Sequence, residues 1–212
     1  MPAEAACAPA GGIPGITVPN IERFAVMKLL HIDSSITGDH SVSRAVSGAV
    51  VNQIKSANPG VDVSYLDLAS NPLPHVTLPD IGDPTSNTAL NAFLAADIIV
   101  IGAGMYNFTV PSQLKAWIDR ILIAGQTFKY TETGPQSLVA GKRAIAVLSR
   151  GGLYGPGAPA EAHEHAESYL RSVFAFLAIP LELIVAEGVA MGDDVRKAAM
   201  AAAFARAQAI AA

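Results

Sequence analysis

The chain has 212 residues, of which 51% are apolar and 15% are charged, and its formal net charge is −4. This length suffices for one domain with a substantial core, and the absence of a long basic run argues against nucleic-acid binding. No apolar stretch reaches the roughly 18 residues that a membrane helix needs. The single Cys7 excludes an internal disulfide framework and a thiolate metal cluster, so a reduced, cytoplasmic location is expected.

Residues 1–26 differ from the rest of the chain. They are rich in Ala, Pro and Gly and contain no Lys and one Arg. A secretory signal needs a basic start and a continuous apolar centre, and neither is present. We interpret residues 1–26 as a flexible N-terminal extension and residues 27–212 as one domain.

The first half of this domain alternates between strand and helix patterns. Residues 27–33 form a short apolar run typical of a buried parallel strand, and residues 45–57 repeat apolar side chains at helical spacing. Residues 61–68 alternate like a half-exposed strand. Residues 69–86 contain four prolines and are expected to be irregular, and residues 87–96 form a short helix capped by one of its first two residues.

The second half continues the alternation. Residues 97–103 form the most hydrophobic strand, and a helix is expected over residues 111–125, with a proline at its start and Gly125 as its C-terminal stop. The remaining elements are, in chain order, a strand over 143–149, a helix over 161–178, a strand over 181–189 and a helix over 193–211.

Five strands joined by helical crossovers predict a parallel sheet covered on both faces, which is a three-layer α/β/α sandwich. The flavodoxin-like strand order 2-1-3-4-5 fits this pattern better than a six-stranded dinucleotide fold. In that order a ligand lies at the carboxyl ends of strands 1, 3 and 4. Those ends are the turns after Ile32, Ala103 and Leu148.

The turn after the first strand is rich in hydroxyl groups. It contains neither a dinucleotide fingerprint nor a nucleoside-triphosphate loop. Hydroxyls and free backbone amides at a helix N-terminus can hold a phosphate monoester without a lysine. Capping of the helix by Ser41 or Ser43 explains the same residues equally well. The hydroxyl-bearing residues are Ser34, Ser35, Thr37, Ser41 and Ser43.

The other two turns add a ring platform and bare backbone. In residues 105–108, aromatic and thioether side chains can pack on a flat ring while Asn107 reads its polar edge. In residues 149–155, paired glycines let the backbone approach a ligand. Taken alone, a helix-start contact and a mobile turn are sufficient explanations. Together with the first turn, they predict a ligand with a phosphate at one end and a flat heteroaromatic system at the other, such as FMN.

Residues 105–152 closely resemble the corresponding segment of FMN-dependent NADH:quinone oxidoreductases, the bacterial azoreductases. The Met-Tyr-Asn-Phe and Ser-Arg-Gly-Gly motifs carry this resemblance, which extends roughly from Met27 to the C-terminus. The family implies a homodimer with one tightly bound FMN per subunit and a substrate pocket over the flavin at the subunit interface. Tyr130 and Phe176 match aromatic pocket positions supplied from the partner side. The FMN contacts of the family match Ser35, Ser41, Val42, Ser43, Met105, Tyr106, Asn107, Phe108, Ser149, Arg150, Gly151 and Gly152.

The chain departs from the family pattern in three places. Val42 replaces the usual Gln, where a backbone contact is expected to persist, and Gly104 replaces the usual Pro before the second turn. The segment between Pro74 and Asp97 is about twenty residues shorter than is typical, a large change for a connection. Substrate preference and interface details therefore do not carry over from the family.

The resemblance implies a ping-pong cycle. NADH or NADPH delivers hydride to FMN N5 and leaves, and a quinone or an azo compound then receives it in the same pocket. The chemistry resides on FMN, so no side chain is expected to act as a dedicated catalytic base. His163 and His165 are expected to lie on a solvated helix face and not in a metal site.

Two other functions remain open from the sequence. A non-enzymatic electron carrier of the flavodoxin type usually has a strongly acidic docking rim, and a net charge of −4 supports that only weakly. A structural protein without flavin is disfavoured by the hydroxyls of the first turn.

Overall fold

The computed structural model describes residues 26–211. Of the expected extension over residues 1–26, all but Val26 lies outside this range. Among the described residues, no helix is long and apolar enough to cross a membrane.

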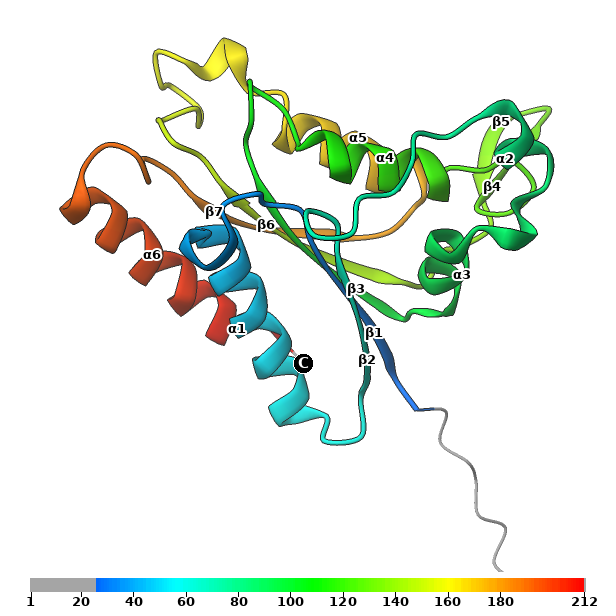
Figure 1. Ribbon diagram of the computed structural model, residues 1–212, viewed down its shortest axis with the longest axis horizontal. Coiled ribbons are helices and arrows are strands. Elements are labelled where there is room, and N and C mark those ends of the chain that lie inside the picture. The colour runs from blue at the N-terminus through cyan, green and yellow to red at the C-terminus, as the bar shows by residue number, and fades with distance from the viewer. Residues whose placement is uncertain (1–25, 212) are drawn as a thin grey trace, which may run out of the picture.

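Five parallel strands form the central sheet in the order β2-β1-β3-β6-β7, as Figure 1 shows. This is the predicted order 2-1-3-4-5 when only the main strands are numbered, so the flavodoxin-like prediction is confirmed. β3 is central, and all seven of its residues are buried, as expected for a parallel strand covered on both faces. The strands are β1 (Lys28–Asp33), β2 (Asp62–Asp67), β3 (Ile98–Gly104), β6 (Arg143–Ser149) and β7 (Leu181–Ala186).

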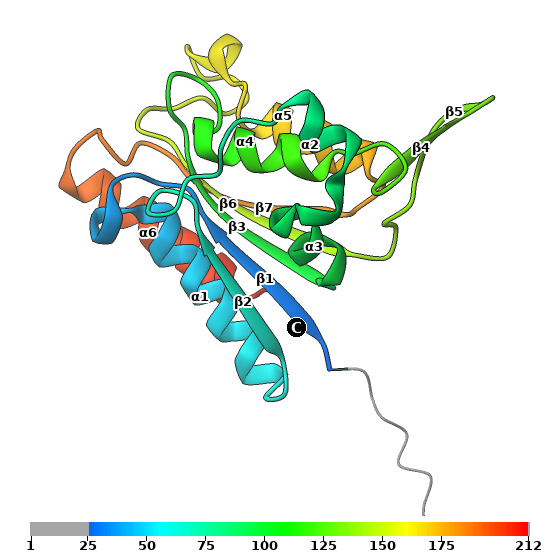
Figure 2. The same ribbon diagram turned by 45° about the vertical axis from the view of Figure 1, so that its right-hand side comes forward.

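Helices cover both faces of the sheet, and Figures 1 and 2 show the two outer layers. One layer consists of α1 (Val42–Ala57) and α6 (Asp193–Gln208). The other contains α3 (Thr88–Ala95), α4 (Ser112–Ile121) and α5 (Glu167–Phe176). Each layer packs its own apolar cluster against the sheet. This arrangement leaves the carboxyl ends of β1, β3 and β6 together at one edge.

The helix expected over residues 111–125 ends earlier, at Ile121. The hydroxyl of Thr127 donates to the Ile121 carbonyl at 2.7 Å and accepts the N–H of Ile123 at 3.2 Å, which satisfies the helix end. Gly125 lies beyond it in a turn with φ 80°. The sequence patterns did not predict the antiparallel hairpin that follows, formed by β4 (Phe128–Thr131) and β5 (Gly134–Ser137).

The proline-rich segment over residues 69–86 contains short helical turns, contrary to the prediction that it is irregular. Thr77 starts α2 (Leu78–Gly82), because Asp80 accepts hydrogen bonds from both its N–H and its hydroxyl, at 2.8 and 2.6 Å. A second turn, η2 (Pro84–Ser86), follows. Proline at the first positions of a helical turn sacrifices no intrahelical hydrogen bond.

The helix expected over residues 161–178 is divided in two. A single 3-10 turn, η3 (Glu161–His163), is separated from α5 by a short extended stretch. The carboxylate of Glu164 accepts the backbone N–H groups at the start of α5, at 2.7 to 3.0 Å. A side chain therefore starts the helix at this point. The N–H donors are those of Ala166, Glu167 and Ser168.

Candidate functional site

The loops after β1, β3 and β6 border a cleft of about 520 Å³. Of the twelve positions predicted to contact FMN, seven line this cleft: Ser35, Ser41, Val42, Met105, Tyr106, Ser149 and Gly151. The other lining residues are Thr37, His40, Gly104, Val189 and Arg196. The three loops named from the sequence therefore meet at one cleft. Thr37 was included among the hydroxyls of the first turn, and Gly104 was noted as a departure from the family, but the sequence patterns did not select His40, Val189 or Arg196.

The first loop ends in a helix N-terminus that faces the cleft. Ser41 is the N-cap of α1, and its hydroxyl accepts the N–H of Arg44 at 3.2 Å, so the capping interpretation is correct for this serine. The backbone N–H groups of Val42 and Ser43 lie in the first turn, where α1 offers them no acceptor. Together with the helix dipole, these donors make this end of the cleft suitable for an anion.

Ser43 is fully buried and does not line the cleft. Its hydroxyl lies 3.1 Å from that of Ser41. The Ser43 hydroxyl therefore holds the side chain of the capping residue Ser41 in place and does not face the cleft.

Tyr106 connects the first loop to the second. Its hydroxyl oxygen lies 3.0 Å from Ser35 Oγ and accepts the N–H of Ile36 at 3.0 Å. Gly104 leaves room for the Tyr106 ring, because a Cβ at position 104 would lie 3.2 Å from it, which is a tight contact. A side chain at position 104 would therefore crowd the ring at the wall of the cleft.

The second loop is a tight turn with a strained backbone. Tyr106 and Thr109 exchange two backbone hydrogen bonds, at 2.9 and 3.1 Å, around Asn107 and Phe108, which have φ values of 47° and 74°. Asn tolerates this left-handed region, whereas Phe rarely occupies it, and such strain is typical of functional loops. Both side chains lie outside the cleft.

The two histidines considered for a metal site clamp this turn. The N–H of His165 donates to the Phe108 carbonyl at 3.0 Å, and the His163 ring packs on the Phe108 ring at 5.1 Å between centroids. Among the described residues, no group of His, Cys, Asp and Glu could hold a metal ion.

The third loop is anchored by a buried arginine. Gly151 lines the cleft, but the Arg150 side chain points away from it and is 2% exposed among three glutamates. Its guanidinium lies 3.2 Å from Glu164, 2.6 Å from Glu167 and 2.7 Å from Glu187. Burial would raise the pKa of Glu167, but hydrogen bonds from Arg171 and Arg150 lower it below its usual value.

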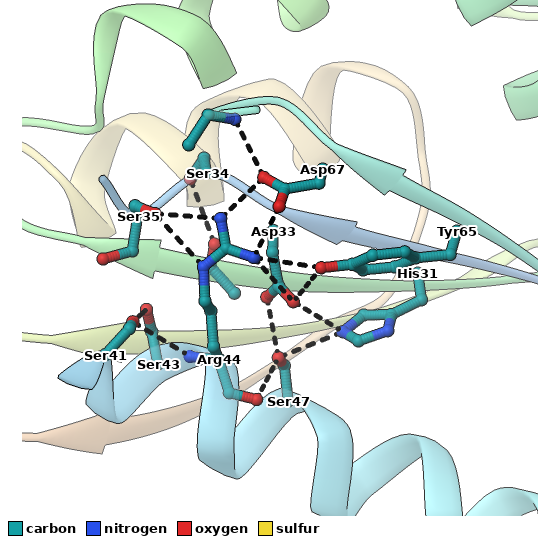
Figure 3. A network of polar contacts seen from close by, with 12 residues as sticks. His31, Asp33, Ser34, Ser35, Ser41, Ser43, Arg44, Ser47, Tyr65 and Asp67 are labelled. Atoms are coloured by element: carbon teal, nitrogen blue, oxygen red, sulfur yellow. Dashed lines mark hydrogen bonds and ion pairs between the residues drawn. The ribbon is translucent and has the colours of Figure 1, made fainter. Parts of the chain in front are cut away.

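A second arginine lies behind the first loop, as Figure 3 shows. Arg44 donates from Nε and Nη2 to the Ser35 carbonyl at 3.1 and 2.9 Å, and its other N–H groups pair with Asp67 at 2.6 and 3.0 Å. Hydrogen bonds from Arg44 hold the pKa of Asp67 well below its usual range. The carbonyl of a cleft residue is thus fixed by an ion pair.

Asp33 is the buried centre of the same network (Figure 3). It accepts hydrogen bonds from Ser47 at 2.8 Å and from Tyr65 at 3.1 Å, and burial followed by the charge of Asp33 raises the pKa of Tyr65 to about 12. His31 Nε2 lies 3.1 Å from Ser47 Oγ. Although serine, histidine and aspartate meet here, Ser47 is fully buried and its hydroxyl donates to Asp33. The cluster supports the sheet edge and presents no nucleophile.

Tyr130 and Phe176 lie together but away from the cleft. Both pack on Phe128, at 5.4 and 4.8 Å between ring centroids. Tyr130 is 74% exposed and Phe176 is 37% exposed. They belong to the end of the molecule that carries the hairpin, which Figure 2 shows projecting from the domain. Neither residue lines the cleft of its own chain.

The chemical character of the cleft suits a flat phosphorylated ligand. Its lining combines hydroxyls, a helix N-terminus and Arg196 with Met105, Tyr106 and the bare backbone of Gly151. No carboxylate lines it. The residues present therefore fit FMN. The fold and the site together define a flavodoxin-like protein with a cleft for a planar, phosphorylated cofactor.

Comparison with known proteins gives the same class. Residues 27–211 match the family described as flavodoxin-like fold. The chain is 54% identical over 194 residues to an FMN-dependent NADH:quinone oxidoreductase of Methylorubrum populi, covering 84% of this chain and 96% of the relative. It is 51% identical over 193 residues to FMN-dependent NADH:quinone oxidoreductase 2 of Bradyrhizobium diazoefficiens, with 84% and 96% covered. The chain belongs to the family of FMN-dependent NADH:quinone oxidoreductases.

Solved structures agree. The azoreductase of Bacillus anthracis str. Sterne superposes with a TM-score of 0.77 at 29% identity, covering 87% of this chain and 100% of that one. An FMN-dependent NADH-azoreductase from Bacillus anthracis str. Ames Ancestor, in complex with FMN, has a TM-score of 0.77 at 26% identity, with 87% and 97% covered.

Within the aligned region, this chain is shorter than the relative from Methylorubrum populi. The match to the Methylorubrum populi protein covers 194 positions, whereas 84% of this 212-residue chain is about 178 residues. That relative therefore carries about 16 residues with no counterpart here.

Proposed function

We propose that the protein is an FMN-dependent NAD(P)H:quinone oxidoreductase that also cleaves azo bonds by reduction. The observation that carries this proposal is the cleft, which joins an anion-binding end to a ring-binding end at the carboxyl edge of the sheet. The family membership of the chain supports the same reaction class.

We assign the phosphate end of the cofactor to Ser35, Ser41 and the first amides of α1. The flavin ring would lie against Met105 and Tyr106, with the backbone of residues 149–152 at its polar edge. When bound there, FMN supplies two-electron chemistry between NADH or NADPH and a quinone or azo acceptor. The protein contributes binding and orientation, and the strained turn at Asn107 shapes the mouth of the cleft.

Arg150 and Ser43 have indirect roles in this proposal. Arg150 holds the third loop by its ion pairs, so that only its backbone is available to the cofactor. Ser43 supports the cap of α1 and offers its N–H. Gly152 contributes backbone alone, and its carbonyl already accepts the N–H of Gly188 at 3.0 Å.

We propose a cytoplasmic homodimer in which the exposed aromatic cluster at the hairpin serves the partner's site. Tyr130 and Phe176 are exposed at a distance from their own cleft, as expected for residues that act across an interface. We place the shortening in the connection between β2 and β3, where Leu78 and Ile81 of α2 are exposed. A shorter connection would change the acceptors that the enzyme admits, which a panel of quinones and azo dyes would measure.

The test begins with the colour of the purified protein. The enzyme should be yellow, should lose its flavin absorbance with NADH and should give parallel double-reciprocal plots with NADH and a quinone. A yellow protein that NADH does not bleach would be an electron carrier. A colourless protein that does not take up FMN would have neither activity.

The cofactor site is tested by Ser35→Ala, with Ser56→Ala as the matched control. Ser35 lines the cleft, whereas Ser56 is exposed near the far end of α1. Loss of a hydrogen bond to a charged group should weaken FMN binding about tenfold in the first variant and leave the second unchanged. Equal affinities would remove Ser35 from the site.

A further inference from the structure

Arg196 brings a cation from the last helix to the first loop. It lies in α6 and lines the cleft beside Thr37, His40 and Ser41. Its Nη2 donates to the His40 carbonyl at 2.9 Å across 156 residues of sequence. This contact links the C-terminal helix to the loop that precedes α1.

The guanidinium is the only Lys or Arg side chain among the residues that line the cleft, and no Asp or Glu lines it. It lies with the hydroxyls of Thr37 and Ser41, at the end that the α1 N-terminus makes suitable for an anion. The pattern of the first turn predicted hydroxyls and amides for the phosphate, and the one cation among the contacts that the resemblance implies, Arg150, does not line the cleft. The tertiary structure supplies one from an element that the motifs do not include.

We propose that Arg196 determines the specificity of the cleft for a phosphorylated flavin, by donating hydrogen bonds to the phosphate of FMN. This inference rests on the proposed FMN site. A guanidinium has five N–H donors, and the contact with His40 uses one of them, so the others can donate to a phosphate dianion as charge-assisted hydrogen bonds. Riboflavin has the same ring and no phosphate. The cation therefore favours FMN and leaves riboflavin binding unchanged.

The experiment measures the dissociation constants of FMN and riboflavin for the apoprotein by quenching of flavin fluorescence. The variants are Arg196→Ala and Arg196→Lys, with Lys197→Ala as the matched control. The control removes the same charge from the next residue of α6, which is exposed and does not line the cleft. Melting curves of each apoprotein establish that it is folded, and Arg196→Gln is the substitute if the alanine variant is not.

Arg196→Ala should weaken FMN binding at least tenfold and change riboflavin binding less than twofold. The FMN affinity of Arg196→Lys should lie between those of Arg196→Ala and the wild type. Lysine keeps the positive charge but loses the planar guanidinium, which can donate two parallel hydrogen bonds to a phosphate. Lys197→Ala should bind both flavins like the wild type. Higher salt should narrow the difference between wild type and Arg196→Ala.

Three results would overturn the inference. Equal losses for FMN and riboflavin would show that Arg196 only tethers His40. Unchanged FMN binding would remove it from the phosphate site, and a selective rise in KM for NADPH would assign it to the nicotinamide co-substrate. If the wild-type apoprotein itself does not bind FMN, the proposed function fails as well. If Ser35→Ala weakens FMN binding and Arg196→Ala does not, only the role of Arg196 fails.

Discussion

The first and third cleft loops are both anchored by an arginine, but the two arginines are held differently. Arg44 pairs closely with Asp67 and more distantly with Asp33, at 3.9 Å, and it donates directly to the Ser35 carbonyl. Arg150 is almost completely buried among three glutamates and acts on its loop through them, since Glu187 also accepts the N–H of Tyr154 at 3.0 Å. The first anchor therefore sets the position of one cleft residue, whereas the second stabilises the folding of a whole region.

The difference follows from burial. The Arg44 side chain is 16% exposed and keeps some contact with water, whereas the Arg150 side chain is 2% exposed. Two of the carboxylates around Arg150 lie at the start of α5 and the third follows β7, and the three would repel one another without it. Mutations at the two anchors should therefore separate an effect on stability from an effect on the cofactor.

Arg150→Met should have the largest effect. Removing a buried charge from its partners typically costs about 3–5 kcal/mol, and here the uncompensated groups are carboxylates. Arg171→Met is the matched control, because Arg171 pairs with the same Glu167 but its side chain is 55% exposed. Its loss should lower the free energy of unfolding by less than about 1 kcal/mol. Urea unfolding of both variants measures the difference, and similar losses would contradict the distinction drawn here.

Arg44→Met should destabilise the protein less, by about 1–3 kcal/mol, because it removes charge-assisted hydrogen bonds at a partly hydrated pair. When both variants are measured as folded apoprotein, Arg44→Met should weaken FMN binding more than Arg150→Met does. The reason is that Arg44→Met removes the hydrogen bonds that fix the Ser35 carbonyl at the cleft. Arg44→Lys should restore little, because a single ammonium cannot hold Ser35 and Asp67 in the same geometry. FMN affinity unchanged in Arg44→Met would leave the anchor with a purely structural role.

Acid should weaken the ion pair between Arg44 and Asp67, and so lower its contribution to the free energy of unfolding. Asp67 has a folded-state pKa below its unfolded value of about 3.9, so its contribution is present above pH 4 and is lost as the pH falls through the folded pKa. Asp67→Asn removes this contribution at every pH. The gap in unfolding free energy between wild type and variant should therefore be constant from pH 7 to 5 and narrow below pH 4. A gap that widens in acid would have the wrong sign.

The second loop has no arginine and is held by its turn, so substitutions there should have the smallest effects. Asn107→Gly should change stability by less than about 1 kcal/mol, because glycine accepts the positive φ of this position. Asn107→Leu should cost about 1–2 kcal/mol more, since a leucine is strained there. FMN binding weaker in both variants than in the wild type would show that the amide acts on the cofactor. Normal binding in Asn107→Gly would restrict Asn107 to the turn.

Local sequence patterns predict most of the fold. Apolar runs and their spacing predict all five strands of the main sheet, and parallel pairing follows from the helical crossovers. The end of α4 and the start of α5 were misplaced because side chains just outside the helices decide them, and apolar periodicity does not reveal these contacts: Thr127 completes one helix and Glu164 starts the other. The β4–β5 hairpin was missed because its four-residue strands are mostly exposed and carry little apolar alternation.

What the sequence by itself determined is the set of cleft loops and the family, because motifs of three or four residues act locally and hold their spacing along the chain. Only the tertiary structure decided which side chains of those motifs face the cleft. Arg150 turns inward because three carboxylates from other elements surround it, and Phe108 turns outward because its turn is clamped to the segment before α5. Arg196 reaches the cleft because α6 packs beside α1, a juxtaposition that no local pattern encodes.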